Sequence, residues 1–177
     1  MFSTCFSKAS ILSFIFFSSN LEFNDDDNII KINFGGYNVE VVTKIIPRYA
    51  ETDQMGIIHH SVYAVWYEQA RTEYFTKVGM KYDEIEASGL MTPLVELNCK
   101  YKRPAYYNQE VEVRTKLVEL SPAKFTVEYN IYDKDGVLLN IGRTTLAWAN
   151  KETFRVVNLK KERPEMYKMM EDLLESE

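Results

Sequence analysis

The stretch from Val62 to Val78 constrains the fold more than any other part of the chain, because it predicts a helix that must be buried. Ser61 stands where an N-cap residue is expected, and Gly79 is typical of the position that ends a helix. The first half of the stretch, residues 62–67, is apolar almost all round. A helix that is apolar on every side is covered by other elements rather than laid on a surface.

Strand patterns lie on both sides of this helix. Residues 39–49 are rich in β-branched and aromatic side chains, with Pro47 marking an edge or a strand end. Residues 94–102 and 137–148 also predict strands, and Asp135-Gly136 is a strong hairpin signal. Two further segments alternate apolar with polar side chains, which indicates antiparallel strands with one solvent-exposed face. The apolar positions are Val111, Val113, Thr115 and Leu117 in one segment, and Phe125, Val127, Tyr129 and Ile131 in the other.

This order of elements predicts an α+β fold. A sheet must cover its apolar face, and residues 62–78 form the one long central helix that the pattern offers. The pattern therefore predicts a curved antiparallel β-sheet wrapped around that helix, which is the hotdog fold. A short C-terminal helix follows from Pro164, with apolar side chains at helical spacing at Met166, Met169, Met170, Leu173 and Leu174.

The first 28 residues differ from the rest, and we expect residues 29–177 to form a single hotdog domain. Lys8 precedes an apolar run from Ile11 to Phe17. This run is short for a secretory signal, no small-residue cleavage site follows it, and it is too short to span a bilayer. We therefore interpret residues 1–28 as a disordered or non-native extension, such as an over-long gene prediction would add, with a signal peptide as the alternative.

Composition argues against several classes of protein. The net charge of −5 disfavours a nucleic-acid binder, which usually carries a basic excess. Cys5 and Cys99 lie far apart without a CxxC partner, so we expect no disulfide framework and a reducing, cytoplasmic location. The two histidines, His59 and His60, are adjacent and no His/Cys cluster surrounds them, so no metal site is expected.

Residues 51–63 bring an acid, a glycine turn, two histidines and a helix start into one short segment. Glycine lets the chain turn sharply, and a helix N-terminus offers unpaired N–H groups with partial positive charge. Such groups can hold a carbonyl oxygen that gains negative charge during acyl transfer. The upstream carboxylate of Asp53 could act on water as a general base, or attack as a nucleophile. Many loop-to-helix junctions contain an aspartate, however, so a simple turn-capping role stays open.

The same segment resembles a family signature, through Thr52-Asp53, Gly56, Ile57-Ile58, His60 and Tyr63. The similarity continues at residues 67–73 and 101–105, and spans roughly residues 40–160. It is similar to the 4-hydroxybenzoyl-CoA thioesterase family, and more closely to its YbgC-like acyl-CoA thioesterase branch. Ile58, where valine is usual, and Pro47 depart from the pattern without touching a reacting group.

The resemblance implies hydrolysis of an acyl-CoA thioester, with Asp53 as general base or nucleophile. It implies that a backbone N–H near His60 polarises the thioester carbonyl while His60 orients the site. The candidate substrate contacts are Gly56, Ile57, His59, Tyr63 and Tyr67. No cofactor is implied beyond the coenzyme A of the substrate itself. The family forms homodimers or homotetramers with active sites at the subunit interface, and an acyl carrier protein is a candidate partner.

Three basic residues, Lys100, Lys102 and Arg103, are candidates for binding the phosphates of coenzyme A. Basic side chains at strand ends are common, so a solvated role is an equal alternative. Tyr63 and Tyr67 could likewise belong to the core, and His59 and His60 could serve the helix end or an interface.

Two other functions fit a hotdog domain. A hydratase or dehydratase would carry a different Asp/His motif with nearby prolines, and none follows His59 or His60. A non-catalytic module that binds acyl-CoA or acyl carrier protein is disfavoured by the intact Asp53. Release of free CoA thiol from a saturated acyl-CoA would distinguish the thioesterase from both.

Overall fold

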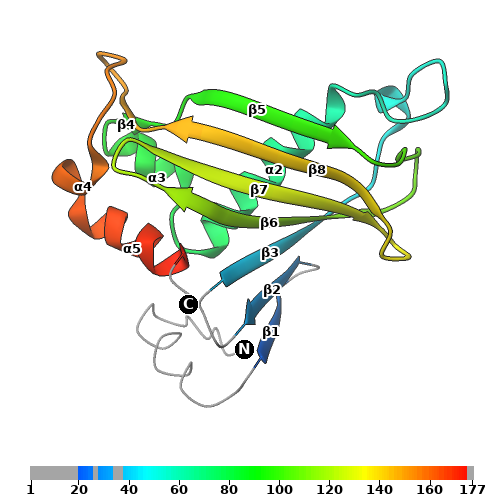
Figure 1. Ribbon diagram of the computed structural model, residues 1–177, viewed down its shortest axis with the longest axis horizontal. Helices are drawn as coiled ribbons and strands as arrows, with labels where there is room; N and C mark the ends of the chain where they lie inside the picture. The colour runs from blue at the N-terminus through cyan, green and yellow to red at the C-terminus, as the bar shows by residue number, and fades with distance from the viewer. Residues whose placement is uncertain (1–19, 26–27, 34–37, 175–177) are drawn as a thin grey trace, which may run out of the picture.

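The computed structural model describes residues 20–25, 28–33 and 38–174 (Figure 1). Its centre is a seven-stranded antiparallel sheet with the strand order β1-β2-β3-β6-β7-β8-β5. The strands are β1 (Asn20–Asp25), β2 (Asn28–Asn33), β3 (Asn38–Ile45), β5 (Leu94–Tyr101), β6 (Val111–Leu120), β7 (Lys124–Asp133) and β8 (Leu138–Ala147). The long helix α2 (Val62–Lys77) lies against one face of this sheet, as Figure 1 shows. The predicted α+β architecture is therefore confirmed.

Helix α2 packs on the sheet through large side chains. Tyr63, Trp66, Tyr67 and Tyr74 are all buried. Strand β8 makes room for them with Gly142, where an added Cβ would lie 2.6 Å from the Tyr67 hydroxyl oxygen. The absence of a side chain at this position is what lets the helix approach the sheet so closely.

One prediction about this helix is wrong. The all-round apolar pattern of residues 62–67 predicts burial on every side, yet Val65 is 56% exposed. The reason is that a single layer of sheet covers one face of α2, and Val65 points away from it. The helix boundaries are confirmed, since α2 ends at Lys77 and Gly79 follows with φ +83°.

The alternation predicted for β6 and β7 is also confirmed. All eight inward positions in these two strands are buried, while Glu112, Arg114, Lys116 and Glu128 are half-buried on the other face. Thr126 differs from these polar neighbours, because it is only 5% exposed. The hairpin between β7 and β8 turns at Gly136, whose φ is +76° and whose N–H donates to the carbonyl of Asp133 at 3.0 Å.

Shorter elements differ from the predictions. β3 ends at Ile45, before Pro47, and a 3-10 turn, η1 (Tyr49–Glu51), replaces the end of the predicted strand. The stretch that leads to Pro93 holds α3 (Tyr82–Ala87) and β4 (Leu90–Met91), which pairs with β9 (Ala149–Asn150). The predicted C-terminal helix is α5 (Pro164–Leu174), and the short helix α4 (Leu159–Glu162) precedes it.

The two edges of the sheet are β1 and β5. Residues 1–28 are predicted to be a disordered or non-native extension, and the described part of this segment includes β1, which pairs with β2. Its apolar run from Ile11 to Phe17 lies outside the described residues. Among the helices that the structure describes, none is both long enough and apolar enough to cross a membrane.

Candidate active site

Asp53 lies in a tight loop just before helix α2. Its N–H donates to the carbonyl of Ile57 at 2.9 Å, and the N–H of Gly56 donates to the Asp53 carbonyl at 3.0 Å. Gly56 has φ +76°, a conformation that glycine adopts without strain. Asp53 Oδ1 accepts the N–H of Met55 at 2.8 Å, whereas Oδ2 accepts no hydrogen bond from the described residues. One carboxylate oxygen therefore fixes the side chain, and the other is available to a ligand.

Neighbouring segments hold this loop in place. The N–H of Ile58 donates to the carbonyl of Ala105 at 2.9 Å, and the N–H of His59 donates to the carbonyl of Glu51 at 2.8 Å. Glu51 is buried, and its Oε1 accepts Arg48 Nε at 3.1 Å and Nη2 at 2.8 Å. The loop is thus anchored both to an ion pair in η1 and to the segment that follows β5.

The start of helix α2 leaves backbone donors without a partner, as helix N-termini do. The N–H of His60 donates to none of the described residues. The carbonyl of His59 accepts the N–H of Val62 at 3.0 Å, which begins the helix. A free N–H at the positive end of a helix can stabilise an oxyanion that forms during acyl transfer. The resemblance predicted such a donor near His60.

His59 and Ser61 interact at this junction in a way that the sequence did not predict. Ser61 stands at the N-cap position, but its side chain makes no capping hydrogen bond. Its hydroxyl lies 2.8 Å from His59 Nδ1, and its backbone N–H donates to the same nitrogen at 3.3 Å. Because a backbone N–H can only donate, Nδ1 is the acceptor, and a neutral His59 carries its proton on Nε2. The exposed His60 ring lies beside it, with 4.0 Å between the ring centroids.

Tyr101, at the end of edge strand β5, reaches the same junction. Its hydroxyl donates to the carbonyl of His60 at 2.9 Å, and its ring meets Tyr63 edge-on at 5.2 Å. Partial burial, and then the nearby Cys99, raise the pKa of Tyr101 to about 12. The phenol therefore remains a donor at any ordinary pH and holds His60 against β5.

Tyr63 and Tyr67 lie deeper than the loop. They are 2% and 0% exposed. The Tyr67 hydroxyl donates to Asn140 Oδ1 and lies 3.2 Å from Cys99 Sγ, and burial raises the pKa of Tyr67 well above its usual value. Tyr67 therefore serves the packing of α2 on the sheet, while Tyr63 stands between the core and Tyr101.

The basic residues Lys100, Lys102 and Arg103 are all exposed where β5 ends. The N–H groups of Lys102 and Arg103 both donate to the carbonyl of Leu139, at 2.9 and 3.0 Å. None of the three forms an ion pair with another described residue. Since Ala105 accepts the N–H of Ile58, this basic group lies on the segment that is tied to the Asp53 loop.

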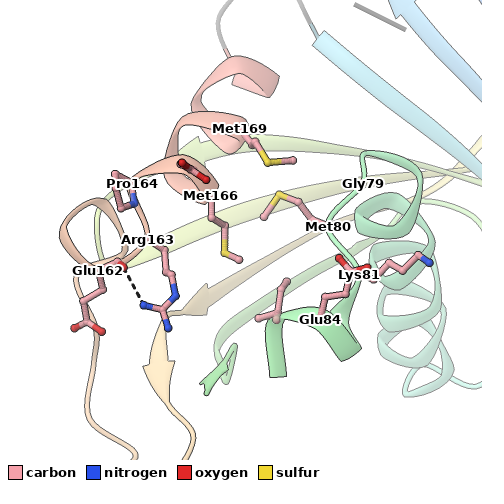
Figure 2. A pocket seen from close by; sticks show the side chains of 11 residues that line it. Gly79, Met80, Lys81, Glu84, Glu162, Arg163, Pro164, Met166 and Met169 are labelled. Carbon is pink, nitrogen blue, oxygen red and sulfur yellow. Dashed lines mark hydrogen bonds between the residues drawn. The ribbon is translucent and has the colours of Figure 1, made fainter. Parts of the chain in front are cut away.

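A pocket of about 440 Å³ lies at the other end of α2, beyond Gly79 (Figure 2). Its apolar lining comes from Met80, Ile85, Met166 and Met169. None of the predicted site residues lines it, and the Asp53 loop lies before the opposite end of the helix. In the described ranges, no three His, Cys, Asp or Glu side chains gather as ligands for a metal ion.

Sequence reasoning missed two contributors to the site. Tyr101 stands within a matched stretch, yet nothing in the chain around it reveals that its hydroxyl contacts His60, 41 positions away. Glu51 precedes Thr52-Asp53 directly, and its burial depends on the η1 turn, which the strand prediction for residues 39–49 overlooked.

Comparisons with known proteins show the family to which this chain belongs. The profile of the family described as the thioesterase-like superfamily matches residues 47–174. A putative acyl-CoA thioesterase, YneP, from Bacillus subtilis is 34% identical over 120 residues, which cover 68% of this chain and 87% of the relative. A DHNA-CoA thioesterase from Staphylococcus aureus is 34% identical with a TM-score of 0.73, over 76% of this chain and 90% of that one. A hypothetical protein, TT1821, from Thermus thermophilus is 40% identical with a TM-score of 0.68, over 76% and 97%. The chain belongs to the thioesterase-like superfamily and is a thioester hydrolase with the hotdog fold, as the resemblance predicted.

Proposed function

We propose that this protein hydrolyses acyl-CoA thioesters, with Asp53 as the reacting carboxylate and the N–H of His60 as the oxyanion donor. The observation that carries the proposal is that one anchored segment, the loop and the helix start, presents both a free carboxylate oxygen and a free backbone N–H. Asp53 Oδ2 accepts no hydrogen bond from the described residues, and the His60 N–H donates none. YneP, which is named as a putative acyl-CoA thioesterase, supports the substrate class.

In the general-base route, Asp53 takes a proton from water as the water oxygen attacks the thioester carbonyl carbon. The carbonyl oxygen becomes an oxyanion and accepts the N–H of His60, at the positive end of α2. The C–S bond then breaks, the CoA thiolate leaves and takes the proton, and the free acid remains. In the nucleophilic route, Asp53 attacks the carbonyl carbon itself, the thiolate leaves, and water hydrolyses the resulting anhydride.

Lys100, Lys102 and Arg103 would bind the phosphates of coenzyme A in this proposal. They are exposed, without an ion-pair partner among the described residues, and lie on the segment tied to the Asp53 loop through Ala105 and Ile58. Cations that are already neutralised by protein carboxylates would be poor phosphate ligands, whereas these three are free to bind.

We further propose a homodimer, or a tetramer built from dimers, joined along β5. Strand β5 is a sheet edge with unpaired backbone groups, and Leu94, Val95 and Leu97 are 50%, 49% and 42% exposed on it. An exposed apolar edge strand invites pairing with another copy. The partner would also cover the outer flank of the site beside Tyr101. A monomer by light scattering at micromolar concentration that is still fully active would exclude this arrangement.

The catalytic proposal is tested with Asp53→Asn, which keeps size and shape but removes basicity. We expect kcat for CoA-thiol release from a saturated acyl-CoA to fall roughly 10²–10⁴-fold, the range for a positioned general base. The matched control is Asp133→Asn, because Asp133 Oδ1 also caps a turn, accepting the N–H groups of Asp135 and Val137. A folded Asp53→Asn enzyme that keeps more than about half of the wild-type rate would exclude this mechanism.

A further inference from the structure

Helix α2 covers strand β8 but covers its neighbour β5 only in part, through the contacts of Tyr101 and Cys99. On β8, Asn140 and Thr144 are 0% and 1% exposed beneath the helix. Their direct cross-strand partners on β5 are Tyr101 and Leu97, which are 52% and 42% exposed. Directly paired residues of antiparallel strands project to the same face of the sheet. An open strip therefore runs along the helix side of β5. We call it the β5 strip, and it comprises Leu94, Leu97, Cys99 and Tyr101.

Arg71 of helix α2 lies at one part of this strip. Its Nη1 lies 3.4 Å from the Thr144 hydroxyl, and Thr144 is the cross-strand partner of Leu97. Its Nε donates to the Tyr82 hydroxyl at 3.2 Å, and Nη1 donates to the Tyr129 hydroxyl at 3.2 Å. The guanidinium is thus held by three neutral hydroxyl groups, from α3, β7 and β8.

The third nitrogen of this guanidinium is unoccupied. Arg71 Nη2 has no hydrogen-bond partner among the described residues. It is also not one of the unpartnered polar atoms that are fully buried. Nη2 is therefore not fully buried, and it carries two N–H donors. No carboxylate of the described residues forms an ion pair with Arg71, and Glu68, one turn earlier, is exposed and makes no hydrogen bond to it. A half-buried cation fixed by neutral groups is a ready receptor for an anion.

The separation between the helix start and Arg71 is estimated from the rise per residue along two elements. Along β5, the four steps from Tyr101 to Leu97 span about 14 Å. Along α2, the nine steps from Val62 to Arg71 also span about 14 Å. The Arg71 side chain leans back toward the helix N-terminus, which shortens the gap. The shortened separation is comparable to the length of a medium-length acyl chain.

We propose that Arg71 binds a carboxylate at the far end of the acyl chain, so that the preferred substrates are CoA monothioesters of medium-chain dicarboxylic acids. This inference rests on the proposed acyl-CoA hydrolysis. The thioester would lie at Asp53 and His60, the methylene chain would lie on the β5 strip, and the distal carboxylate would accept the N–H groups of Arg71 Nη2. In the proposed dimer, the partner subunit would close the open side of the strip.

The first test uses the wild-type enzyme alone. We would measure kcat/KM for pairs of equal carbon number, namely suberoyl-CoA with octanoyl-CoA, sebacoyl-CoA with decanoyl-CoA, and succinyl-CoA with butyryl-CoA. We expect the carboxylated substrate to be favoured about tenfold to a hundredfold in the two longer pairs, which is the discrimination that a hydrogen bond to a charged group supplies. The short pair should show no such preference, because its carboxylate cannot reach Arg71. A preference for the unsubstituted chain at every length would overturn the proposal.

The second test removes the charge. Arg71→Met should abolish the preference for the carboxylated substrate while leaving octanoyl-CoA hydrolysis largely intact. The matched control is Arg143→Met, which removes the same charge from the strand position next to Thr144, where Arg143 instead pairs with Glu128 at 2.6 Å and is exposed. If Arg71→Met does not fold, Tyr82→Phe keeps the charge but removes one anchor, and it should lower the same preference severalfold.

The outcomes separate this inference from the proposed function. If no acyl-CoA releases thiol, the proposed function itself fails. If plain acyl-CoAs are hydrolysed without any preference for a distal carboxylate, only the role of Arg71 fails. If Arg71→Met lowers kcat/KM equally for both members of every pair, Arg71 serves the coenzyme A part or the fold, which also overturns the proposal.

Discussion

Tyr101→Phe tests whether edge strand β5 controls the start of helix α2. The substitution removes one hydroxyl, which donates to the His60 carbonyl at 2.9 Å, and it keeps the ring that meets Tyr63 at 5.2 Å. A hydrogen bond between neutral groups contributes about 0.5–1.5 kcal/mol. If that energy holds the His60 N–H in its oxyanion-binding position, its loss lowers kcat by about twofold to tenfold. KM should change less, because the bond positions the proposed oxyanion donor rather than the bulk of the substrate.

The assay is CoA-thiol release at saturating and limiting acyl-CoA, together with a thermal melt of each variant. The melting temperature should fall by no more than about 4 °C, since one partly exposed hydrogen bond is lost. Tyr106→Phe is the matched control, because Tyr106 is 43% exposed and its hydroxyl bonds to no described residue. An unchanged kcat in folded Tyr101→Phe, or an equal loss in both variants, would refute the positioning role.

Two further predictions concern the sheet. Gly142→Ala should destabilise the fold by about 1–3 kcal/mol in denaturant unfolding, because the new Cβ would collide with the Tyr67 ring; a neutral effect would show that α2 can shift. Glu128 is partly desolvated, which raises its pKa, but the hydrogen bond from Arg143 and the charge of Lys116 outweigh this and lower the pKa overall. A lowered pKa stabilises the fold above the unfolded-state pKa, and this stability is lost as the pH falls through the folded-state pKa. Glu128→Gln should therefore be slightly less stable than wild type at neutral pH, with a difference that vanishes in acid, as melts across pH would reveal.

The sequence predicts those parts of the fold that local patterns determine. Gly79 ends helix α2, and Asp135-Gly136 forms the β7–β8 turn, so the predicted bounds of both elements lie close to the observed ones. β4 is only two residues long and exists because β9 pairs with it, so no local pattern reveals it. The apolar pattern predicts that Val65 is buried, whereas it is exposed, because periodicity does not show how many layers of structure cover a helix.

The candidate site divides in the same way. Asp53, Gly56 and the His60 N–H lie within one short segment whose turn and helix start are visible in the sequence. The contacts of Arg71 and Tyr101 join residues that are far apart along the chain, such as Arg71 with Thr144 and Tyr101 with His60. Long-range contacts of this kind follow from the strand order, and a single sequence does not reveal which side chains they bring together.

The strand order also determines the sequence of events as the chain folds. β6, β7 and β8 are consecutive and joined by short turns, so their pairing closes only small loops. β3 must find β6 across the whole of α2 and β5, and β5 must find β8 across the intervening hairpin. Such distant pairings are slow, because chain entropy is lost before the contacts form. We therefore expect the β6–β8 meander to form early. The Asp53 loop, which Ala105 anchors beyond β5, would be completed last, so a nascent chain would acquire a stable centre well before it could turn over a substrate.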